Sequence, residues 1–331
     1  MKPSFWLAFS CIKGVGSVTM RDFYNKYPYF DFYLLDDIGF MERVESSFKK
    51  FLDDDLIEAG INEANRLLKI HDFNGIKVIS YESPYYPISL RFIKDPPVVL
   101  YAKGNIELLK NMDMVAIVGT REPTDIGLKS AKKIASRFVD MGYVIVSGLA
   151  LGIDTAGHEG ALRKEKGRTI AVMAGDLTKI YPAKNKSLAN EILEKEGLLI
   201  SETPIGKPNT RGSFVQRDRI QSGLSLGICP VQTPIKSGTQ HTIRFAKEQE
   251  RLIFTPTILD IELEENAVQG NLNLIKEGCI ELTDPSIYEK VDLKMQLIKH
   301  ELVKKNEVIK KQKYIQSNDR KMIVQPSFWE I

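Results

Sequence analysis

Short apolar runs alternate with segments of helical spacing through the middle of the chain, and this alternation predicts the architecture. The run at 114–118 is apolar, ends at Gly119 and is followed by a segment with helical spacing. A second run, at 143–146, ends in the glycine-containing turn 147–154 and also precedes a helical segment. Strands that are apolar on both faces are typical of parallel sheets with helices covering each side. Two such units in tandem predict a doubly wound α/β sheet.

The same rhythm of strand, turn and helix continues to about residue 256. Further strands are predicted at 168–173, 198–200, 226–231 and 252–254, and further helices at 186–194, from 214 onward and from the Ser237-Gly238 turn to 248. Before the first unit, the runs at 76–80 and 97–101 predict two extra strands at the sheet edge, because the prolines between them prevent one continuous helix. We therefore expect an extended Rossmann-like domain over residues 73–284.

Residues 1–72 lack this alternation and predict a small helical domain. The apolar positions expected to form its core are Leu7, Phe23, Leu34, Phe48, Leu52 and Leu56. The segment 14–17 resembles the hairpin of a helix-hairpin-helix or SAM-like module, in which backbone N–H groups can meet a phosphate. A glycine turn that joins two helices explains the same residues, and a single hairpin does not decide the function.

Residues 285–331 are strongly charged, and we expect them to form a basic helical tail. The basic residues are Lys294, Lys299, Lys304, Lys305, Lys310, Lys311, Lys313, Arg320 and Lys321. The apolar residues with the spacing of an amphipathic helix are Leu293, Leu297, Leu302 and Ile309. The charge indicates either a solvated face or an electrostatic contribution to binding. Because these residues lie outside the strand and helix rhythm, the tail is expected to be dispensable for folding.

Composition places the chain among globular proteins. Of its 331 residues 43% are hydrophobic, yet no apolar run approaches the roughly 20 residues of a membrane span. The segment 5–12 is too short for a secretory signal, so we expect a cytoplasmic protein with no membrane partner. The three cysteines form no CxxC pair, so neither a metal site nor a disulfide framework is predicted. The net charge of +3 is too small to indicate nucleic acid by itself.

Candidate binding residues gather where the strands end, because ligands of doubly wound sheets bind beyond the carboxyl ends of the strands. The turn residues expected at this edge are Gly119, Thr120, Ser147, Gly148, Gly152, Ser237 and Gly238. Gly119, Gly148 and Gly152 are expected to leave room for a phosphate, and each following helix directs N–H groups and its positive dipole end there. The edge is therefore a candidate site for an anionic ligand.

Three arginines are candidates for gripping that anion. Arg121 directly follows the first strand, and Arg217 and Arg219 are expected to open a later helix. Guanidinium groups in such positions bind phosphate bidentately. The alternative for Arg217 and Arg219 is pairing with sheet-edge carboxylates such as Asp154 or Glu202.

Other common sites have little support in the sequence. The turn 119–127 is not G-x-G-x-x-G and no G-x-x-x-x-G-K-[ST] is present, which argues against dinucleotide binding and ATP-driven chemistry. Asp154 and His158 are spaced for one helix face and could form an acid–base pair. We favour structural roles instead: Asp154 would cap the helix, and His158 would form a hydrogen bond in a packed turn. No catalytic residue, cofactor or metal ligand is therefore assigned.

Six short motifs stand in an order that one known family shares. They are GTR at 119–121, SGLALGID at 147–154 with His158, the YP turn with Asn185, SETP at 201–204, FVQRDRI at 214–220 and SGT at 237–239. Together they resemble the DNA-processing protein A family, DprA/Smf, over about residues 75 to 260. The segment 86–101 looks like that family's lead-in strands, and the N-terminal segment looks like its SAM-like domain.

The resemblance implies a Rossmann-like domain that binds single-stranded DNA, forms homodimers, and helps to load the RecA recombinase onto incoming strands in transformable bacteria. It assigns the family's basic pocket to Gly119, Thr120, Arg121, Asn185, Arg217 and Arg219. Backbone N–H groups and arginines would hold phosphates there while the pocket receives a base. We expect single-stranded DNA to bind more tightly than duplex, because a pocket of turns is too narrow for a duplex.

The chain departs from the family's pattern in three ways. Asp218 replaces the usual asparagine of an RNR stretch, SGTQHT at 237–242 replaces an SGSLIT-like turn, and no winged helix is recognisable in the tail. A divergent member that acts in defence or in a mobile element is one alternative. Another is a nucleotide-binding or nucleotide-hydrolysing protein like the LOG-type phosphoribohydrolases, although the turn 237–242 lacks their P-G-G-x-G-T-x-x-E pattern and its glutamate.

Overall fold

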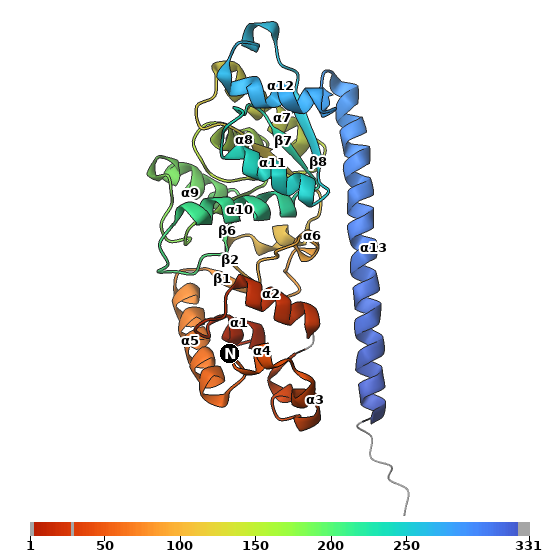
Figure 1. The fold of residues 1–331 in the computed structure, drawn as a ribbon. Coiled ribbons are helices and arrows are strands. Elements are labelled where there is room, and N and C mark those ends of the chain that lie inside the picture. The colour runs from red at the N-terminus through yellow and green to blue at the C-terminus, as the bar shows by residue number, and fades with distance from the viewer. Residues whose placement is uncertain (1–2, 28–29, 324–331) are drawn as a thin grey trace, which may run out of the picture.

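The structure, a computed structural model, describes residues 3–27 and 30–323 and consists of an N-terminal group of helices below a large α/β sheet (Figure 1). The N-terminal helices are α1 (Phe5–Ser10), α2 (Ser17–Lys26), α3 (Ile38–Arg43), α4 (Ser46–Lys49) and α5 (Asp54–Phe73), with a 3-10 turn at Phe32–Leu34. Of the six apolar positions predicted for their core, five are buried and Leu56 packs against it partly buried. The helical character of this segment is thus confirmed.

The longest of these helices, α5, has clear start and stop signals. Asp53 caps its N-terminus by accepting a hydrogen bond from the Asp55 N–H at 3.1 Å. Acidic residues in the first turn also favour the helix dipole. The helix ends before Gly75, whose φ of +67° lies in the left-handed region that glycine adopts most readily.

Among the described residues, nine strands form one sheet in the order β1-β2-β6-β5-β4-β3-β7-β8-β9. The strands are β1 (Lys77–Ser80), β2 (Val99–Gly104), β3 (Met114–Val118), β4 (Val144–Ser147), β5 (Thr169–Met173), β6 (Leu198–Ser201), β7 (Gly227–Pro230), β8 (Leu252–Pro256) and β9 (Ile280–Leu282). β3 to β9 are parallel, whereas β1 pairs antiparallel with β2, and β2 with β6. The doubly wound sheet with two extra edge strands is confirmed.

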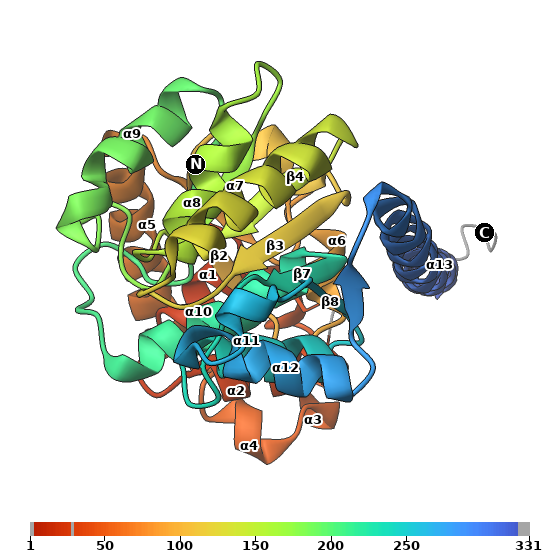
Figure 2. The ribbon, with the colours of Figure 1, turned by 90° about the horizontal axis from the view of Figure 1, so that it is seen from above.

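Helices cover both faces of the sheet (Figure 2). One face carries α7 (Asp125–Asp140), α8 (Ile153–Leu162) and α9 (Lys186–Glu194), and the other carries α10 (Arg211–Leu224), α11 (Thr239–Glu248) and α12 (Gln269–Lys276). The strand side chains alternate accordingly: Met114, Ala116 and Val118 enter one buried cluster, and Val115 and Ile117 enter the other. The remaining short elements are α6 (Ile88–Arg91) and 3-10 turns at Ile106–Lys110, Ala183–Asn185, Asp260–Glu262 and Asn266–Val268.

The strand order reverses between β3 and β7. The chain runs outward from β3 through β4 and β5 to β6, then crosses back so that β7 pairs with the other side of β3. Val118 and Pro230, near the carboxyl ends of these two strands, are direct partners in the register. Ligands of doubly wound sheets bind at such a switch point, so this edge is where a site is expected.

Two expectations about the later elements need correction. The strand and helix rhythm continues past residue 256, because α12 and β9 add one more parallel unit to the sheet. Helix α10 begins at residue 211 and not at 214, because Thr210 and Ser213 form a capping box. Arg217 and Arg219 therefore lie in the middle of α10, where they have no access to its N-terminal N–H groups.

The basic tail forms the long helix α13 (Pro285–Ile323), which stands along one side of the molecule (Figure 1). Val291, Met295 and Leu302 are buried in the core cluster that also contains Phe138 of α7. Of the predicted apolar face, Leu302 is buried as expected, whereas Leu293 and Leu297 are both 67% exposed, so the prediction is wrong for these two. Ile309 and the basic side chains beyond 308 lie outside the side chains that the structure describes, and 324–331 lie outside the described residues.

We expected the tail to be dispensable for folding, but the packing of the first half of α13 contradicts this expectation. Its inner face supplies buried residues to the sheet, and Lys299 Nζ lies 2.7 Å from the Asp113 carboxylate, just before β3. Periodicity alone could not choose between two overlapping apolar faces of this helix. Neither α13 nor any other helix within the described ranges is both long and apolar enough to cross a membrane.

Candidate functional site

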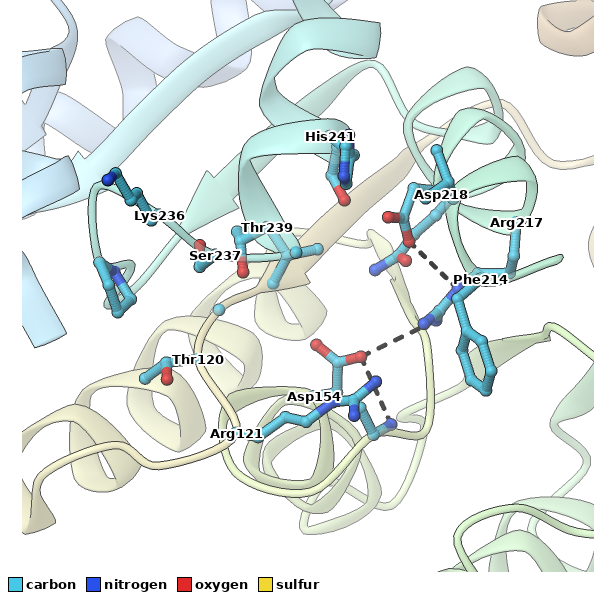
Figure 3. Close-up of a pocket in the computed structure, with 18 of the residues that line it drawn as sticks. Thr120, Arg121, Asp154, Phe214, Arg217, Asp218, Lys236, Ser237, Thr239 and His241 are labelled. Atoms are coloured by element: carbon cyan, nitrogen blue, oxygen red, sulfur yellow. Dashed lines mark hydrogen bonds and ion pairs between the residues drawn. The ribbon is translucent and has the colours of Figure 1, made fainter. Parts of the chain in front are cut away.

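A pocket of about 470 Å³ opens at the switch point of the sheet (Figure 3). Three walls enclose it: the turn 119–122 after β3, the segment 234–242 that leads into α11, and the face 214–221 of α10. The start of α8 adds Asp154 from below. Since the pocket joins both halves of the sheet, it is the position where the topology predicts a ligand.

The rim of the pocket, Arg121 and Lys236, carries two exposed cations. Figure 3 shows them on different turns, on two sides of the opening. In the described part of the chain, neither side chain has an ion pair with a carboxylate. The Arg121 guanidinium lies 5.9 Å from the ring centroid of Phe214, whose ring is in turn 5.7 Å from that of Tyr181. The rim therefore offers positive charge that is free to bind an anion, next to accessible aromatic surface.

The N-terminus of α11 opens into the same pocket. Its N-cap is Gly238, which has no side chain to accept hydrogen bonds from the first turn of the helix. Ser237 and Thr239 flank it and line the pocket, and the Ser237 hydroxyl lies 2.8 Å from Thr233 Oγ1. The Gln240 and His241 N–H groups donate to the Ser237 and Gly238 carbonyl oxygens at 3.2 and 3.0 Å, and the positive end of the helix dipole favours an anion at this position.

The floor of the pocket, Asp154, Arg217 and Asp218, is buried and holds two carboxyl groups and one guanidinium group. Arg217 Nη1 lies 3.9 Å from Asp154 Oδ2, and Arg217 Nε lies 3.2 Å from Asp218 Oδ1. Arg217 also donates a hydrogen bond to the Val172 carbonyl oxygen at 3.2 Å. The alternative in which Arg217 pairs with carboxylates is therefore the correct one. Arg217 joins α10 to β5 and α8 and holds the two acids in position.

Burial shifts the pKa values of these acids. It raises the pKa of Asp218 to about 7, with Asp154 adding to the rise and Arg217 and Arg121 opposing it. Burial also raises the pKa of Asp154, although Arg217 and the backbone N–H groups of Ala150 and Gly148 counteract it. Asp154 Oδ2 accepts the Gly148 N–H at 3.1 Å and so stabilises the β4–α8 turn. Asp154 is therefore structural, but the predicted helix cap is wrong: the N-cap of α8 is Gly152, and Asp154 lies in the first turn of the helix.

His158 is a core residue. Burial, with the nearby Arg217 charge, lowers its pKa to about 3, so its imidazole is neutral at physiological pH. Its Nδ1 lies 2.7 Å from the Thr169 hydroxyl, and the ring is fully buried. His158 does not line the pocket, so the structure gives no geometry for an acid–base pair with Asp154.

The glycines of the turns are needed for close packing, which corrects their expected role. A Cβ at Gly148 would lie 1.3 Å from Arg217 Nη1, and one at Gly119 would lie 2.6 Å from Ile153 Cγ1. At Gly152 the φ of +79° is left-handed, and a Cβ would meet the Thr120 carbonyl oxygen at 2.4 Å. Protein atoms thus fill the space that we expected a phosphate to use.

Arg219 lies away from the pocket with every guanidinium nitrogen engaged. Its Nη2 donates to both oxygens of Glu202 at 2.8 Å, its Nε to Asp95 at 3.2 Å and its Nη1 to the Gln216 carbonyl at 3.1 Å. The pairing alternative describes this arginine too. Arg219 does not line the pocket in which it was expected to bind phosphate, and it holds β6 and the loop before β2 against α10.

Two further side chains that were predicted to contact DNA form hydrogen bonds within the protein instead. Asn185 donates from Nδ2 to the Leu149 carbonyl oxygen at 2.8 Å, which orders the β4–α8 turn. Ser147 donates to the Ile117 carbonyl oxygen at 2.7 Å and is fully buried. Both side chains therefore position the backbone near the pocket and do not line it.

The predicted residues that the pocket does bring together are Gly119, Thr120, Arg121, Arg217, Ser237 and Gly238. Sequence reasoning missed Lys236 and Gln221 as lining residues. Lys236 had a usable signal, because it directly precedes the glycine turn that follows a predicted strand. Gln221 had none beyond its position one helical turn after Asp218. Within the described residues, no group of three or more His, Cys, Asp or Glu side chains could hold a metal ion.

Comparison with known families and proteins gives consistent matches. The family described as DNA recombination-mediator protein A matches residues 77–291. Protein Smf of Synechocystis sp. is 36% identical over 287 residues, which cover 84% of this chain and 69% of that protein. DNA processing protein DprA of Bacillus subtilis is 40% identical over 214 residues, covering 65% of this chain and 70% of that protein.

Solved structures resemble the fold over much of its length. DNA processing protein A of Streptococcus pneumoniae aligns with a TM-score of 0.66 and 27% identity, covering 86% of this chain and 97% of that one. The protein of that name from Helicobacter pylori aligns with a TM-score of 0.58 and 30% identity, covering 66% and 96%. The Helicobacter pylori structure concerns a single-stranded DNA binding mode.

Proposed function

Because the chain belongs to the DNA recombination-mediator protein A family of DNA-processing proteins, we propose that it binds single-stranded DNA in the pocket between β3 and β7. The observation that carries this proposal is the rim. Arg121 and Lys236 are exposed cations without carboxylate partners in the described part of the chain, and they flank the N-terminus of α11, which has no side-chain cap. This arrangement suits the phosphates of a strand that passes over the opening.

The aromatic side chains beside the rim suit unpaired bases. Phe214 lines the pocket, and Tyr181, which packs against it, is 53% exposed. Base stacking on aromatic rings contributes about 1–3 kcal/mol per base and requires bases that are free of a duplex. In a duplex the bases are stacked inside the helix. Its phosphates could still contact the rim cations, but its bases could not stack on the aromatic side chains. The Helicobacter pylori relative's single-stranded DNA binding supports the same choice.

The buried side chains act as positioning residues in this proposal. Arg217 fixes Asp154 and Asp218, and Asn185 and Ser147 fix the turns on which the pocket is built. We propose no catalytic step, because binding and handing over a strand requires none. Incubation with nucleoside monophosphates tests the competing hydrolase function: released base would contradict a purely binding role.

The family's description as a recombination mediator supports a further step. We propose that the protein acts as a homodimer and passes its bound strand to a RecA-type recombinase in DNA uptake or processing. The test measures whether the protein accelerates recombinase filament formation on strands coated with single-stranded DNA-binding protein. No acceleration, with strand binding intact, would remove the recombinase from the proposal.

The binding proposal itself is tested by fluorescence anisotropy with one labelled strand and the duplex that contains it, over a series of salt concentrations. We expect the single strand to bind more tightly at every concentration. Equal or tighter binding of the duplex would contradict the proposal, because the aromatic surface would then contribute nothing.

A further inference from the structure

The pocket has a basic rim and an acidic floor, and a phosphate-binding function leaves the floor unexplained. Asp218 lines the pocket and is 8% exposed. Arg217 Nε touches one of its oxygens at 3.2 Å, yet within the described residues no donor makes a hydrogen bond to the carboxylate. Asp154 differs, since backbone N–H groups of the β4–α8 turn already occupy its Oδ2. Asp218 is thus the open acceptor of the floor.

Resting on the proposed binding of single-stranded DNA, we propose that Asp218 selects the base that enters the pocket. It accepts hydrogen bonds from the exocyclic amino group of cytosine, adenine or guanine, and it disfavours thymine.

Charge decides which part of a nucleotide reaches the floor. A phosphate is repelled by two buried carboxylates and stays at the rim with Arg121 and Lys236, so a base edge is what enters. An ionised carboxylate only accepts hydrogen bonds, and an aspartate accepting from the cytosine amino group is an established pairing. Thymine presents two carbonyl oxygens beside its single ring N–H, and these oxygens repel the carboxylate. The base edge therefore carries the discrimination.

Gln221 supplies the matching donor. It lies three residues after Asp218 on α10, lines the same pocket and is 1% exposed. Its Nε2 is buried without a hydrogen-bond partner among the described residues. Such an atom carries a desolvation cost unless a ligand satisfies it. An acceptor at Asp218 and a donor at Gln221 together fit an amino group beside a ring nitrogen, as in cytosine and adenine.

The charge of Asp218 makes this selection depend on pH. The groups that face it are Arg217 on its own helix, Asp154 from α8, Arg121 from the β3 turn, and Lys236 and His241 from the α11 side. Burial raises its pKa to about 7, so the carboxylate is ionised at pH 8.5 and largely protonated at pH 6. A protonated carboxyl can donate to a thymine oxygen, and the preference then weakens.

The experiment compares a short oligo-dT with the same strand in which a few spaced thymines are replaced by 5-methylcytosine. The two bases differ at the base-pairing edge and keep the same methyl group. By anisotropy at pH 8.5 we expect the cytosine strand to bind at least about fivefold more tightly than oligo-dT. This factor is the lower end of the discrimination that a good contact to a base edge provides. At pH 6 the ratio should fall toward one. This comparison uses the unmodified protein.

The variant Asp218→Asn supplies the second arm, because an amide both donates and accepts at the same volume. The ratio at pH 8.5 should fall below about twofold, chiefly through tighter binding of oligo-dT. The matched control Asp125→Asn removes an exposed charge at the start of α7 outside the pocket lining and should leave the ratio unchanged.

Two outcomes separate the inference from the function on which it rests. An equal gain for both strands in Asp218→Asn would mean that Asp218 only repels phosphate, which overturns base selection and leaves strand binding standing. Failure of the unmodified protein to bind either strand would overturn the proposed function itself.

Discussion

Arg121 and Arg219 have opposite surroundings, and this difference determines what each contributes. Arg121 is exposed at the pocket rim, where its guanidinium lies over the Phe214 ring and forms no ion pair with a carboxylate of the described residues. Arg219 is 3% exposed and is held between Glu202 and Asp95. An exposed arginine without a buried partner contributes little to stability, whereas removal of one member of a buried ion pair leaves an uncompensated charge.

Replacing Arg121 with alanine should weaken binding to all single-stranded sequences alike. A phosphate contact carries no sequence information, and each one lost should lower the salt slope by about 0.7. The melting temperature should be nearly unchanged. Arg163→Ala is the control, since Arg163 is an exposed arginine at the other end of α8 and should affect neither quantity. Unfolding of Arg121→Ala would instead make this arginine a structural partner.

Arg219→Ala should show the reverse behaviour. We expect a loss of about 2–3 kcal/mol in the free energy of unfolding, less than for a fully buried pair because Glu202 and Asp95 still reach solvent. Urea unfolding measures this loss. The salt slope of DNA binding by the folded fraction should stay the same. A lower slope would mean that Arg219 does contact the DNA.

Asp218→Asn should stabilise the protein at high pH and much less at low pH. Burial raises the pKa of Asp218 to about 7 from an ordinary value of about 3.9. A carboxyl with a raised folded-state pKa contributes stability that is fully present below pH 4 and is lost as the pH rises to 7. The variant should therefore gain on the order of 1–4 kcal/mol over the unmodified protein above pH 7. Thermal unfolding at pH 4.5 and 8.5 compares the two, and an equal offset at both would contradict the assignment.

At the scale of elements, α13 is the helix whose role the structure changes most. Truncation after residue 284 would remove Val291, Met295 and Leu302 from the core and expose Phe138. Losses of about 2–5 kcal/mol for each of these three side chains add up to about 6–15 kcal/mol, which is comparable to the whole stability of a typical domain. We expect this truncation to abolish cooperative unfolding, which circular dichroism measures. Truncation after Val308 should preserve cooperative unfolding. Equal behaviour of the two proteins would contradict the packing of α13.

The elements were largely predictable, because buried parallel strands are apolar on both faces and their turns are rich in glycine. β9 was not, since it has three residues and pairs on one side only with β8. The pocket was predictable as a place, because topology fixes where strands end. Its inner chemistry was only partly predictable: pairing of Arg219 with Glu202 was one of two alternatives, and only the fold decides for it and shows that Gly148 makes room for Arg217. Long-range pairs of this kind leave no trace in local periodicity.

At the scale of the whole molecule, the N-terminal helices and the sheet share one core. The buried cluster that contains Phe5 and Phe23 continues through Leu100 into the sheet. Polar contacts cross the same boundary, since Trp6 Nε1 donates to Glu82 at 2.9 Å. Asp95 also bridges it, with one oxygen 4.0 Å from Arg21 of α2 and the other 3.2 Å from Arg219 of α10. A contiguous core of this kind favours cooperative unfolding of both parts.

The shared core predicts that the helical part and the sheet unfold in a single transition. The chain has two tryptophans, and Trp329 lies outside the described residues, so Trp329→Phe leaves Trp6 as the single reporter. Trp6 is fully buried, and its emission should shift to the red when the helical part opens. Far-UV circular dichroism follows the whole molecule, and in urea the two curves should coincide. Arg21→Ala weakens the boundary without touching the core and should move both curves together. A Trp6 transition that finishes at lower urea than the dichroism signal would show that the helical part opens independently, and the shared core would then not couple the two parts.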